Sequence, residues 1–421
     1  MVMDTQMSSP VHTLRTSCRG CGGHDLHKFL PLGPSPLANS FLKSEDEFRD
    51  ELFFDLDVYF CESCSLVQLL DVISPELLFR DYIYVTGTSD TIAKHNIAYA
   101  KAVVDLLELG PEDLVVEVAS NDGSLLRCFQ KHGVKTLGID PAVNIAEKAR
   151  AHGVETIAEF FNSDLARNVR KSHGGARAII GNNVLAHVDD TLDFLSGAHD
   201  LLVGSGLLVV EVPYLGELLE RFEYDTVYHE HLCYFSVNAL MRLFERARLR
   251  IMRVDRVSVH GGSIRVYGGR EDACIDHSPE VTKLAEQERS AGMTRLSTFN
   301  RLAEDVRMNR EAIVTLLKKL RDEGKSVCGY GAPAKGNTLL NYCNITTDLL
   351  SYTVDKNPMK VGLYTPGMHI PVFPVDRLLE KQPDYVMILA WNFADEIMQQ
   401  QKEYHDRGGK FIIPIPHPEI V

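Results

Sequence analysis

The pattern of apolar residues predicts an α/β unit in the middle of the chain. Four short apolar runs are typical of parallel strands buried on both faces, at residues 114–119, 135–139, 178–181 and 207–212. Segments with apolar residues at helical spacing lie before and between them, at 92–109, 145–152 and 191–202. Because strands and helices alternate, we expect a doubly wound parallel sheet with helices on both faces.

A second α/β unit is predicted after a long helix. Apolar residues recur at helical spacing from about residue 280 to 321, and Gly324 is placed to end that helix. Four further apolar runs predict strands at 326–331, 350–355, 385–390 and 410–415. We therefore expect an α/β protein in three parts: a small module at 1–75, a central domain at 76–270, and a C-terminal domain at 271–421 that includes the long helix.

The N-terminal module contains two closely spaced cysteine pairs. Cys18 and Cys21 form one C-x2-C pair, and Cys61 and Cys64 form a second pair after 39 intervening residues. A Pro/Gly-rich loop at 31–36 and a strand at 52–60 are predicted between them. Four thiolates on two knuckle turns can close a tetrahedral Zn²⁺ site with no open position, so the sequence predicts a structural zinc site. Two unrelated structural or redox pairs are the alternative.

Composition narrows the class of protein. Of the 421 residues, 45% are apolar and 24% are charged, so the chain is expected to fold around cores rather than remain disordered. The net charge of −14 argues against a general nucleic-acid binder and against binding to anionic membranes. A cytoplasmic protein is favoured by three features. The start of the chain is polar, no apolar run is long enough to span a membrane, and the cysteines are few and odd in number.

A polar turn after the first strand of the central domain points to a nucleoside site. The turn starts after Glu117, and Asp140 ends the next strand, where a carboxylate can accept both ribose hydroxyls. A dinucleotide would require G-x-G-x-x-G, whereas only Gly123 is present and Asp122 would repel a phosphate. S-Adenosylmethionine, a common nucleoside without phosphates, fits better. The candidate cofactor residues are Glu117, Ala119, Asn121, Gly123, Asp140, Pro141, Asn182 and Asn183; a ligand-free corner, with both asparagines as plain turn residues, is the alternative.

Several longer motifs carry a resemblance to a known family. They are Asp81-Tyr82-Ile83-Tyr84, the Asn-Asn element before His187, Val212-Pro213-Tyr214, Tyr228-His229-Glu230-His231, and Gly329-Tyr330-Gly331-Ala332-Pro333-Ala334-Lys335-Gly336-Asn337. Together with the cysteine pairs, these motifs cover nearly the whole chain. The chain resembles the nucleotide-sugar C-methyltransferases, which alkylate the carbon next to the ketone of dTDP-4-keto-deoxysugars in antibiotic pathways.

The resemblance implies an N-terminal zinc domain, a central S-adenosylmethionine domain and a C-terminal Rossmann-like domain that helps to bind a dTDP-linked 4-keto-deoxysugar. It implies His231 as the general base, with the reaction centre lined by Tyr82, His187, Tyr228 and Glu230. Substrate contacts are expected from Tyr84, Tyr214, Lys335 and Asn337, and either Tyr82 or Tyr84 fits the position at the reaction centre. Neither nucleic acid nor a membrane is an expected partner, and the oligomeric state, a monomer included, stays open.

The chemistry of such a reaction accounts for these residue types. A carbon–carbon bond forms from a sulfonium only if a carbanion equivalent is available, and a sugar carbon supplies one only beside a carbonyl group. A histidine with a pKa of about 6.5 suits removal of the α-proton. Tyrosine hydroxyls or a neutral His187 suit stabilisation of the enolate oxygen. Both carbons beside the ketone, C3 and C5, satisfy this chemistry.

Two structural and functional alternatives accompany this hypothesis. If residues 228–231 were a strand, Tyr228 and Glu230 would share one face and His229 and His231 the other; a loop is the alternative.

Gly329, Gly331 and Lys335 follow a predicted strand and suit a diphosphate, and Asp355 ends the next strand, as in NAD sites. A nicotinamide-dependent nucleotide-sugar oxidoreductase is therefore the alternative enzyme, and a non-catalytic zinc-ribbon scaffold is the third hypothesis.

Overall fold

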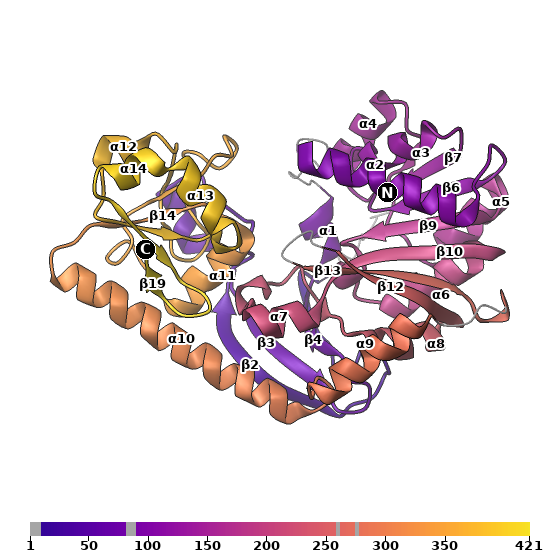
Figure 1. Ribbon diagram of the computed structural model, residues 1–421, viewed down its shortest axis with the longest axis horizontal. Helices are drawn as coiled ribbons and strands as arrows, with labels where there is room; N and C mark the ends of the chain where they lie inside the picture. Colours follow the sequence, from indigo (N-terminus) through magenta and orange to yellow (C-terminus); the bar gives the residue numbers. More distant parts are fainter. Residues whose placement is uncertain (1–9, 81–89, 258–261, 274–277) are drawn as a thin grey trace, which may run out of the picture. The chain divides into compact units, whose positions relative to one another are not determined.

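The computed structural model describes residues 10–80, 90–257, 262–273 and 278–421 (Figure 1). Contacts divide the chain into two compact units, each assembled from three segments. The first unit comprises Met1–Leu26, Cys61–Leu215 and Leu232–Thr294, and the second comprises His27–Phe60, Gly216–His231 and Arg295–Val421. The three domain boundaries expected from the sequence stay a prediction. Across the described part of the chain, every helix is too short or too polar to traverse a bilayer.

The first unit is built on a seven-stranded sheet with the order β12-β13-β10-β9-β6-β7-β8 (Figure 1). All four strands predicted for the central domain are present in it. The parallel strands are β6 (Leu114–Val118), β7 (Lys135–Ile139), β8 (Thr156–Ile157), β9 (Ala176–Asn182) and β10 (Leu202–Pro213), and the antiparallel ones are β12 (Leu249–Val257) and β13 (Ser263–Arg270). Winding reverses between β6 and β9, which is where doubly wound sheets bind ligands.

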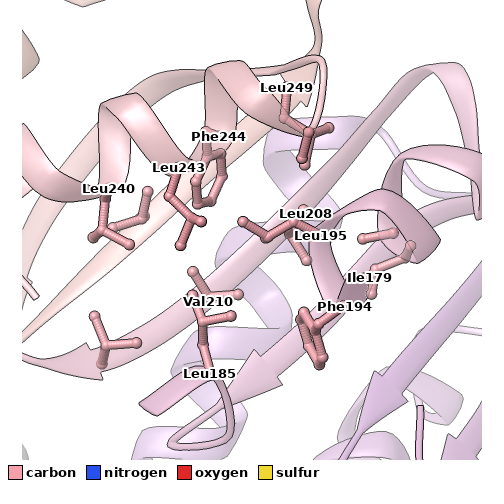
Figure 2. Close-up of a cluster of buried hydrophobic side chains, with 14 of the residues drawn as sticks. Ile179, Leu185, Phe194, Leu195, Leu208, Val210, Leu240, Leu243, Phe244 and Leu249 are labelled. Carbon is pink, nitrogen blue, oxygen red and sulfur yellow. The ribbon is translucent and has the colours of Figure 1, made fainter. Parts of the chain in front are cut away.

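Alternate residues of the central strands supply two hydrophobic cores. Leu114, Val116 and Val118 of β6 belong to one core, and Val115 belongs to the other. Figure 2 shows the first core, in which Phe194 and Phe244 are labelled. Helices α5 (Ser163–His173), α6 (Thr191–Leu201) and α8 (Val237–Arg246) contribute to this core, whereas α2 (Asp90–Leu107), α3 (Ser124–Gln130) and α4 (Val143–Ala151) contribute to the second. Burial on both faces explains the continuous apolar runs of these strands.

Short strands surround the cysteine pairs in the first unit. β1 (His12–Leu14) pairs antiparallel with β5 (Asp71–Ile73), and β4 (Val67–Leu69) pairs antiparallel with β11 (Cys233–Tyr234). The helix α1 (Pro75–Phe79) follows β5. Pairing of β4 with β11 joins the N-terminal segment to a strand that lies more than 160 residues further along the chain.

The loop predicted at 31–36 is wrong, because β2 (Leu26–Ser35) continues through it. Leu30 and Leu32 are buried, whereas Pro31 between them is exposed, which is the alternation of a strand with one buried face. β2 is the edge strand of its sheet, which is where proline is tolerated within a strand. The strand predicted at 52–60 is present as β3 (Phe54–Cys61), after the short helix η1 (Glu45–Asp50).

The second unit contains a six-stranded sheet with the order β16-β15-β14-β17-β18-β19. All strands predicted for the C-terminal domain are present, although β15 is short. They are β14 (Val327–Tyr330), β15 (Thr353–Val354), β16 (Val372–Phe373), β17 (Tyr385–Ile388) and β18 (Lys410–Ile413), which are parallel, with β19 (Glu419–Ile420) antiparallel to β18. The helices are α11 (Ala334–Cys343), α12 (Arg377–Lys381), α13 (Ala394–Gln400) and α14 (Lys402–Asp406).

The single long helix predicted at 280–321 is wrong, because two helices occupy this stretch. α9 (Pro279–Ser290) ends before Gly292, whose φ of +78° is left-handed, and α10 (Leu296–Asp322) begins four residues later. The amphipathic pattern continues across the break, so periodicity alone did not reveal it. Gly324, with a φ of +72°, follows the end of α10 as predicted.

Candidate active site

The four cysteines of the two C-x2-C pairs converge in the first unit. Their Sγ atoms all lie within 4.8 Å of one another, with 3.5 Å between Cys18 and Cys64 and 3.5 Å between Cys21 and Cys61. Each pair forms a turn: the Gly22 N–H donates to Cys18 O, and the Ser65 N–H donates to Cys61 O, both at 2.8 Å. Four sulfur donors on two turns fit a tetrahedral structural Zn²⁺, as the spacing predicted.

Three residues with left-handed backbone shape the turn after β6. The φ values are +56° at Ala119, +48° at Asn121 and +73° at Gly123. A Cβ at Gly123 would lie 2.7 Å from Val154 Cγ2, so this position requires glycine for space as well as for φ. Left-handed backbone at Ala119 costs free energy that the surrounding structure must supply, and such strain is concentrated at functional sites.

Carboxylates gather at this turn, which we call the carboxylate corner (residues 117–123 and 140–142). Glu117, Asp122 and Asp140 are 6%, 3% and 6% exposed. Asp140 accepts the backbone N–H groups of Asn121 and Ala142, both at 2.9 Å. The first hydrogen bond joins the end of β7 to the turn after β6, and the second closes a short turn around Pro141. The corner therefore lies at the reversal point of the sheet.

One buried oxygen at the carboxylate corner suits a cationic nucleoside. Glu117 Oε2 has no hydrogen-bond partner among the described residues. Burial, followed by the nearby charges of Asp140 and Asp122, raises the pKa of Glu117 well above its usual value. A buried acceptor beside two further carboxylates fits the hydroxyl and ammonium donors of S-adenosylmethionine and disfavours a phosphate.

A buried polar network around β9 joins the predicted residues Asn182 and Asn183 to residues that were not predicted from the sequence. The Tyr99 hydroxyl of α2 donates to Asn182 Oδ1 at 3.1 Å, and the Asn183 N–H donates to the Glu211 carbonyl at 2.8 Å. Arg265 Nε donates to Glu211 Oε1 at 2.6 Å, and the Arg265 guanidinium lies 3.6 Å from the centre of the Tyr99 ring. Strand pairing brings these residues together from distant positions, and the local signals were two single charges within apolar runs, Glu211 and Arg265.

His187 and Tyr214 are also placed in the first unit. His187 ends the short helix η3 (Leu185–His187), and its ring meets Phe79 edge to face with 5.8 Å between ring centres. Tyr214 is buried, and the Arg256 guanidinium lies 5.4 Å from its ring centre. Their roles in the reaction centre and in substrate binding stay predictions. Tyr82 and Tyr84 lie outside the described residues.

The Tyr-His-Glu-His block of the second unit is a turn rather than a strand. The His231 N–H donates to Tyr228 O at 2.8 Å, which brings the two side chains onto the same side. We call residues 226–231 the histidine turn. His231 Nδ1 lies 2.9 Å from Thr226 O, and because a carbonyl only accepts, Nδ1 carries the hydrogen. Nε2 of the neutral ring therefore keeps its lone pair and accepts from the Tyr228 hydroxyl at 2.8 Å.

The other polar residues of this block are held by the second unit. Glu230 is buried and accepts from Asn39 Nδ2 at 2.7 Å, and burial raises the pKa of its carboxyl group. His229 Nε2 lies 3.2 Å from Asp55 O. Glu230 is thus fixed by a neutral amide rather than by a cation, so ionisation of its buried carboxyl group is disfavoured.

The C-terminal glycine motif forms the corner between β14 and α11. Gly331 has a φ of +87°, and the Ala332 N–H donates to Asp355 Oδ2 at 2.7 Å. Asp355 Oδ1 also accepts the Asn357 N–H at 2.7 Å, so this carboxylate makes the same two backbone contacts that Asp140 makes at the carboxylate corner. Asn337 is buried, and its Nδ2 donates to Ala38 O at 2.7 Å.

Lys335 lies among aromatic and acidic side chains. Its Nζ is 5.1 Å from the centre of the Trp391 ring, and Trp391 Nε1 donates to Asp225 Oδ2 at 2.7 Å. Burial raises the pKa of Asp225 to about 6 and that of Glu223 to about 7, and the charge of Lys335 limits both shifts. The Lys335 charge is therefore partly balanced within the protein.

Methyltransferases of known structure resemble part of the chain. The S-adenosylmethionine-bound magnesium protoporphyrin IX methyltransferase of Synechocystis is 15% identical, with a TM-score of 0.33, and the match covers 43% of this chain and 82% of that one. An S-adenosylmethionine-dependent methyltransferase of Clostridium acetobutylicum is 14% identical, with a TM-score of 0.35, over 47% of this chain and 95% of that one.

Family models and a sequence relative extend over nearly the whole chain. A putative zinc binding domain matches residues 18–79, a methyltransferase domain matches 93–254, and a C-methyltransferase C-terminal domain matches 258–416. The C-methyltransferase NovU of Streptomyces niveus is 38% identical over 404 residues, which is 96% of each chain. The chain therefore belongs to the C-methyltransferase family that joins a zinc-binding domain, a methyltransferase domain and a C-methyltransferase C-terminal domain, and it is an S-adenosylmethionine-dependent C-methyltransferase.

Proposed function

We propose that this enzyme removes a proton from the carbon α to the ketone of a dTDP-linked 4-keto-deoxysugar and methylates that carbon. The observation that carries the proposal is the fixed tautomer of His231, whose Nδ1–H is taken by Thr226 O so that Nε2 keeps a basic lone pair. The motifs shared with nucleotide-sugar C-methyltransferases, and the 38% identity to the C-methyltransferase NovU, support the substrate class.

The carboxylate corner is the proposed site of the methyl donor. When bound, S-adenosylmethionine supplies an electrophilic methyl group on a cationic sulfur. Asp140 is the proposed acceptor for ribose hydroxyls, and the buried Glu117 Oε2 is the proposed acceptor for an ammonium or hydroxyl donor. The four cysteines would hold Zn²⁺ as a structural ion, because no coordination position is open to a substrate.

The histidine turn is the proposed site of proton removal. His231 Nε2 takes the α-proton, and positioned proton transfer of this kind typically contributes about 10²–10⁴-fold to the rate. The Tyr228 hydroxyl, 2.8 Å from Nε2, must first turn away. If the Tyr228 hydroxyl turned towards the ketone oxygen, it would uncover the lone pair of Nε2 and could donate a hydrogen bond to the enolate oxygen. One such hydrogen bond stabilises the transition state by about 3–4 kcal/mol in comparable sites. Lys335 and Asn337 remain proposed substrate contacts.

Hydrogen exchange at the substrate tests the base separately from methyl transfer. The enzyme is incubated in D₂O with a dTDP-linked 4-keto-6-deoxyhexose and S-adenosylhomocysteine, and NMR follows deuterium at C3 and C5. We expect exchange at one of these carbons, and methylation at the same carbon when S-adenosylmethionine replaces the homocysteine analogue. Exchange that persists in His231→Asn would remove His231 as the base, and methylation at oxygen would remove the proposed reaction.

A further inference from the structure

The four-cysteine site is joined to the His187 segment by a chain of polar contacts within the first unit. It begins at a ligand sulfur, because Gln68 Nε2 donates to Cys18 Sγ at 3.0 Å. Gln68 Oε1 accepts the backbone N–H of Arg19 at 3.0 Å. Gln68 is completely buried, and both ends of its side-chain amide are hydrogen-bonded, one to the Cys18 sulfur and the other to the Arg19 backbone.

Arg19 carries the connection onward to Asp189. The Arg19 side chain is 0% exposed, and its Nε donates to Asp189 Oδ1 at 3.0 Å. Its Nη1 also contacts the Leu69 carbonyl, which belongs to the strand that carries Gln68. Arg15 Nη1 adds contacts of 3.0 and 3.1 Å to the two carboxylate oxygens of Asp189. A buried guanidinium holds its carboxylate partner firmly, because separation leaves an uncompensated buried charge.

Asp189 lies two residues after His187, at the end of a segment that is otherwise anchored by its apolar side chains. Leu185 is fully buried, and Figure 2 shows it in the first hydrophobic core. The Ala186 carbonyl accepts the Leu232 N–H at 2.8 Å, and the Leu232 carbonyl in turn accepts the Leu69 N–H at 3.0 Å. Strand β4 thus contacts residues 185–189 by two routes, one through Arg19 and one through Leu232.

We propose that Gln68, Arg19 and Asp189 are positioning residues that fix the segment 185–189, and with it the His187 ring, to the four-cysteine site. The inference about His187 rests on the proposed function together with the predicted place of His187 in its reaction centre, whereas the connection from the cysteines to residues 185–189 does not. The metal site then acts on the reaction through the backbone of η3 rather than by touching the substrate. This goes beyond a zinc module that stabilises only its own segment.

Hydrogen–deuterium exchange of the full-length, zinc-loaded protein tests the connection. Asp189→Asn keeps the shape of the side chain and removes the charge that pairs with Arg19. We expect the backbone amides of residues 184–190 to exchange at least about tenfold faster, with zinc content and the exchange of β6 unchanged. The matched control is Asp164→Asn, which removes a charge from the exposed ion pair with Arg167 on α5 and should leave residues 184–190 unaffected. Wild-type exchange of this segment in Asp189→Asn would overturn the proposal.

A second variant separates the relay from loss of the metal. Gln68→Met keeps the volume of the side chain but removes its hydrogen bonds with Cys18 and Arg19. If zinc is retained and the amides of residues 184–190 exchange faster, the signal passes through Gln68 as proposed. If zinc is retained and those amides are unchanged, Gln68 is not part of the connection and the proposal fails at its first step.

A double-mutant cycle tests whether the connection reaches the chemistry. We expect Asp189→Asn to lower kcat by about tenfold with the KM for S-adenosylmethionine unchanged. In a His187→Asn background, the same substitution should lower kcat by less than about a further twofold. Additive losses would show that Asp189 does not act through His187 and would overturn that part of the proposal. Full activity of His187→Asn alone would instead contradict the predicted role of His187 in the reaction centre, and the exchange data would still decide the connection.

Discussion

The carboxylate corner and the histidine turn hold their polar groups by different means. At the carboxylate corner, three left-handed residues lie within five positions and one carboxylate oxygen, Glu117 Oε2, has no partner among the described residues. At the histidine turn, both nitrogens of His231 are engaged, by Thr226 and Tyr228. The first region keeps a buried acceptor and left-handed backbone next to each other, whereas the second presents a histidine whose tautomer is set by the Thr226 carbonyl.

The difference extends to how each region is supported. The carboxylate corner is built from residues close in sequence, with Asp140 as its one longer link. The histidine turn depends on distant partners: Thr338 Oγ1 donates to Val227 O at 2.9 Å, and the Tyr224 hydroxyl donates to Asn309 Oδ1 at 2.7 Å. We therefore expect mutations at the carboxylate corner to change donor affinity and mutations around the histidine turn to change proton transfer.

The largest expected effect is that of His231→Asn. Loss of the base should lower kcat by about 10³-fold, because asparagine cannot accept the α-proton. Affinity for S-adenosylhomocysteine, measured by calorimetry, should stay within twofold of wild type because the carboxylate corner is unchanged. If His231→Asn weakened the binding of S-adenosylhomocysteine as strongly as it lowers kcat, the two regions would not have the separate roles proposed for them.

The next effect concerns pH and the buried Asp225 beside the histidine turn. Burial raises the pKa of its carboxyl group to about 6, about two units above the usual value, so between about pH 4 and 6 the folded state holds a proton that the unfolded state has released. The free energy of unfolding should therefore fall by up to about 3 kcal/mol as pH rises through this window. Asp225→Asn should remove this contribution, leaving that of Glu223, whose pKa is about 7.

Urea unfolding at pH 4.5 and 6.5 measures this contribution. Trp391 is the single tryptophan of the chain and donates to Asp225, so its fluorescence reports on the second unit. The exposed Asp348 provides the control, since Asp348→Asn should keep the wild-type pH dependence. An unchanged pH dependence in Asp225→Asn would contradict the prediction.

A smaller effect is expected from Asp140→Asn at the carboxylate corner. The amide keeps one acceptor for the backbone but loses the charge, and a hydrogen bond to a charged group is worth about 1.5–3 kcal/mol. Affinity for S-adenosylhomocysteine should therefore fall by about 10- to 100-fold. Deuterium exchange at the substrate carbon should be unaffected. Glu112→Gln, at an exposed ion pair with Lys135, is the matched control and should bind the ligand as wild type does.

The finest test compares two tyrosine hydroxyls, one in each unit. Tyr224→Phe leaves Asn309 Oδ1 unpaired, and Tyr99→Phe leaves Asn182 Oδ1 unpaired, at a cost of about 1 kcal/mol each. We expect Tyr224→Phe to lower substrate deuterium exchange by about fivefold with normal donor affinity, and Tyr99→Phe to lower donor affinity by about fivefold with normal exchange. Reversed effects, or equal ones, would show that the two regions are not separate in function.

The sequence by itself determined the elements whose signals are local. Buried parallel strands gave continuous apolar runs, the C-x2-C spacing predicted two sulfur-bearing turns, and small and acidic residues marked the carboxylate corner, because each of these depends on neighbours within a few positions. Local signals also misled: prolines at 31–36 suggested a loop where an edge strand runs, and continuous periodicity hid the break at Gly292.

Only the tertiary structure decided which distant groups meet. The tautomer of His231 depends on the carbonyl of Thr226, the support of its turn depends on Asn309 and Thr338, and the link from Cys18 to the His187 segment passes through Gln68, Arg19 and Asp189. None of these pairings has a periodic or spacing signature. The physical reason is that a hydrogen bond between distant residues requires only that folding bring a donor and an acceptor to the same place.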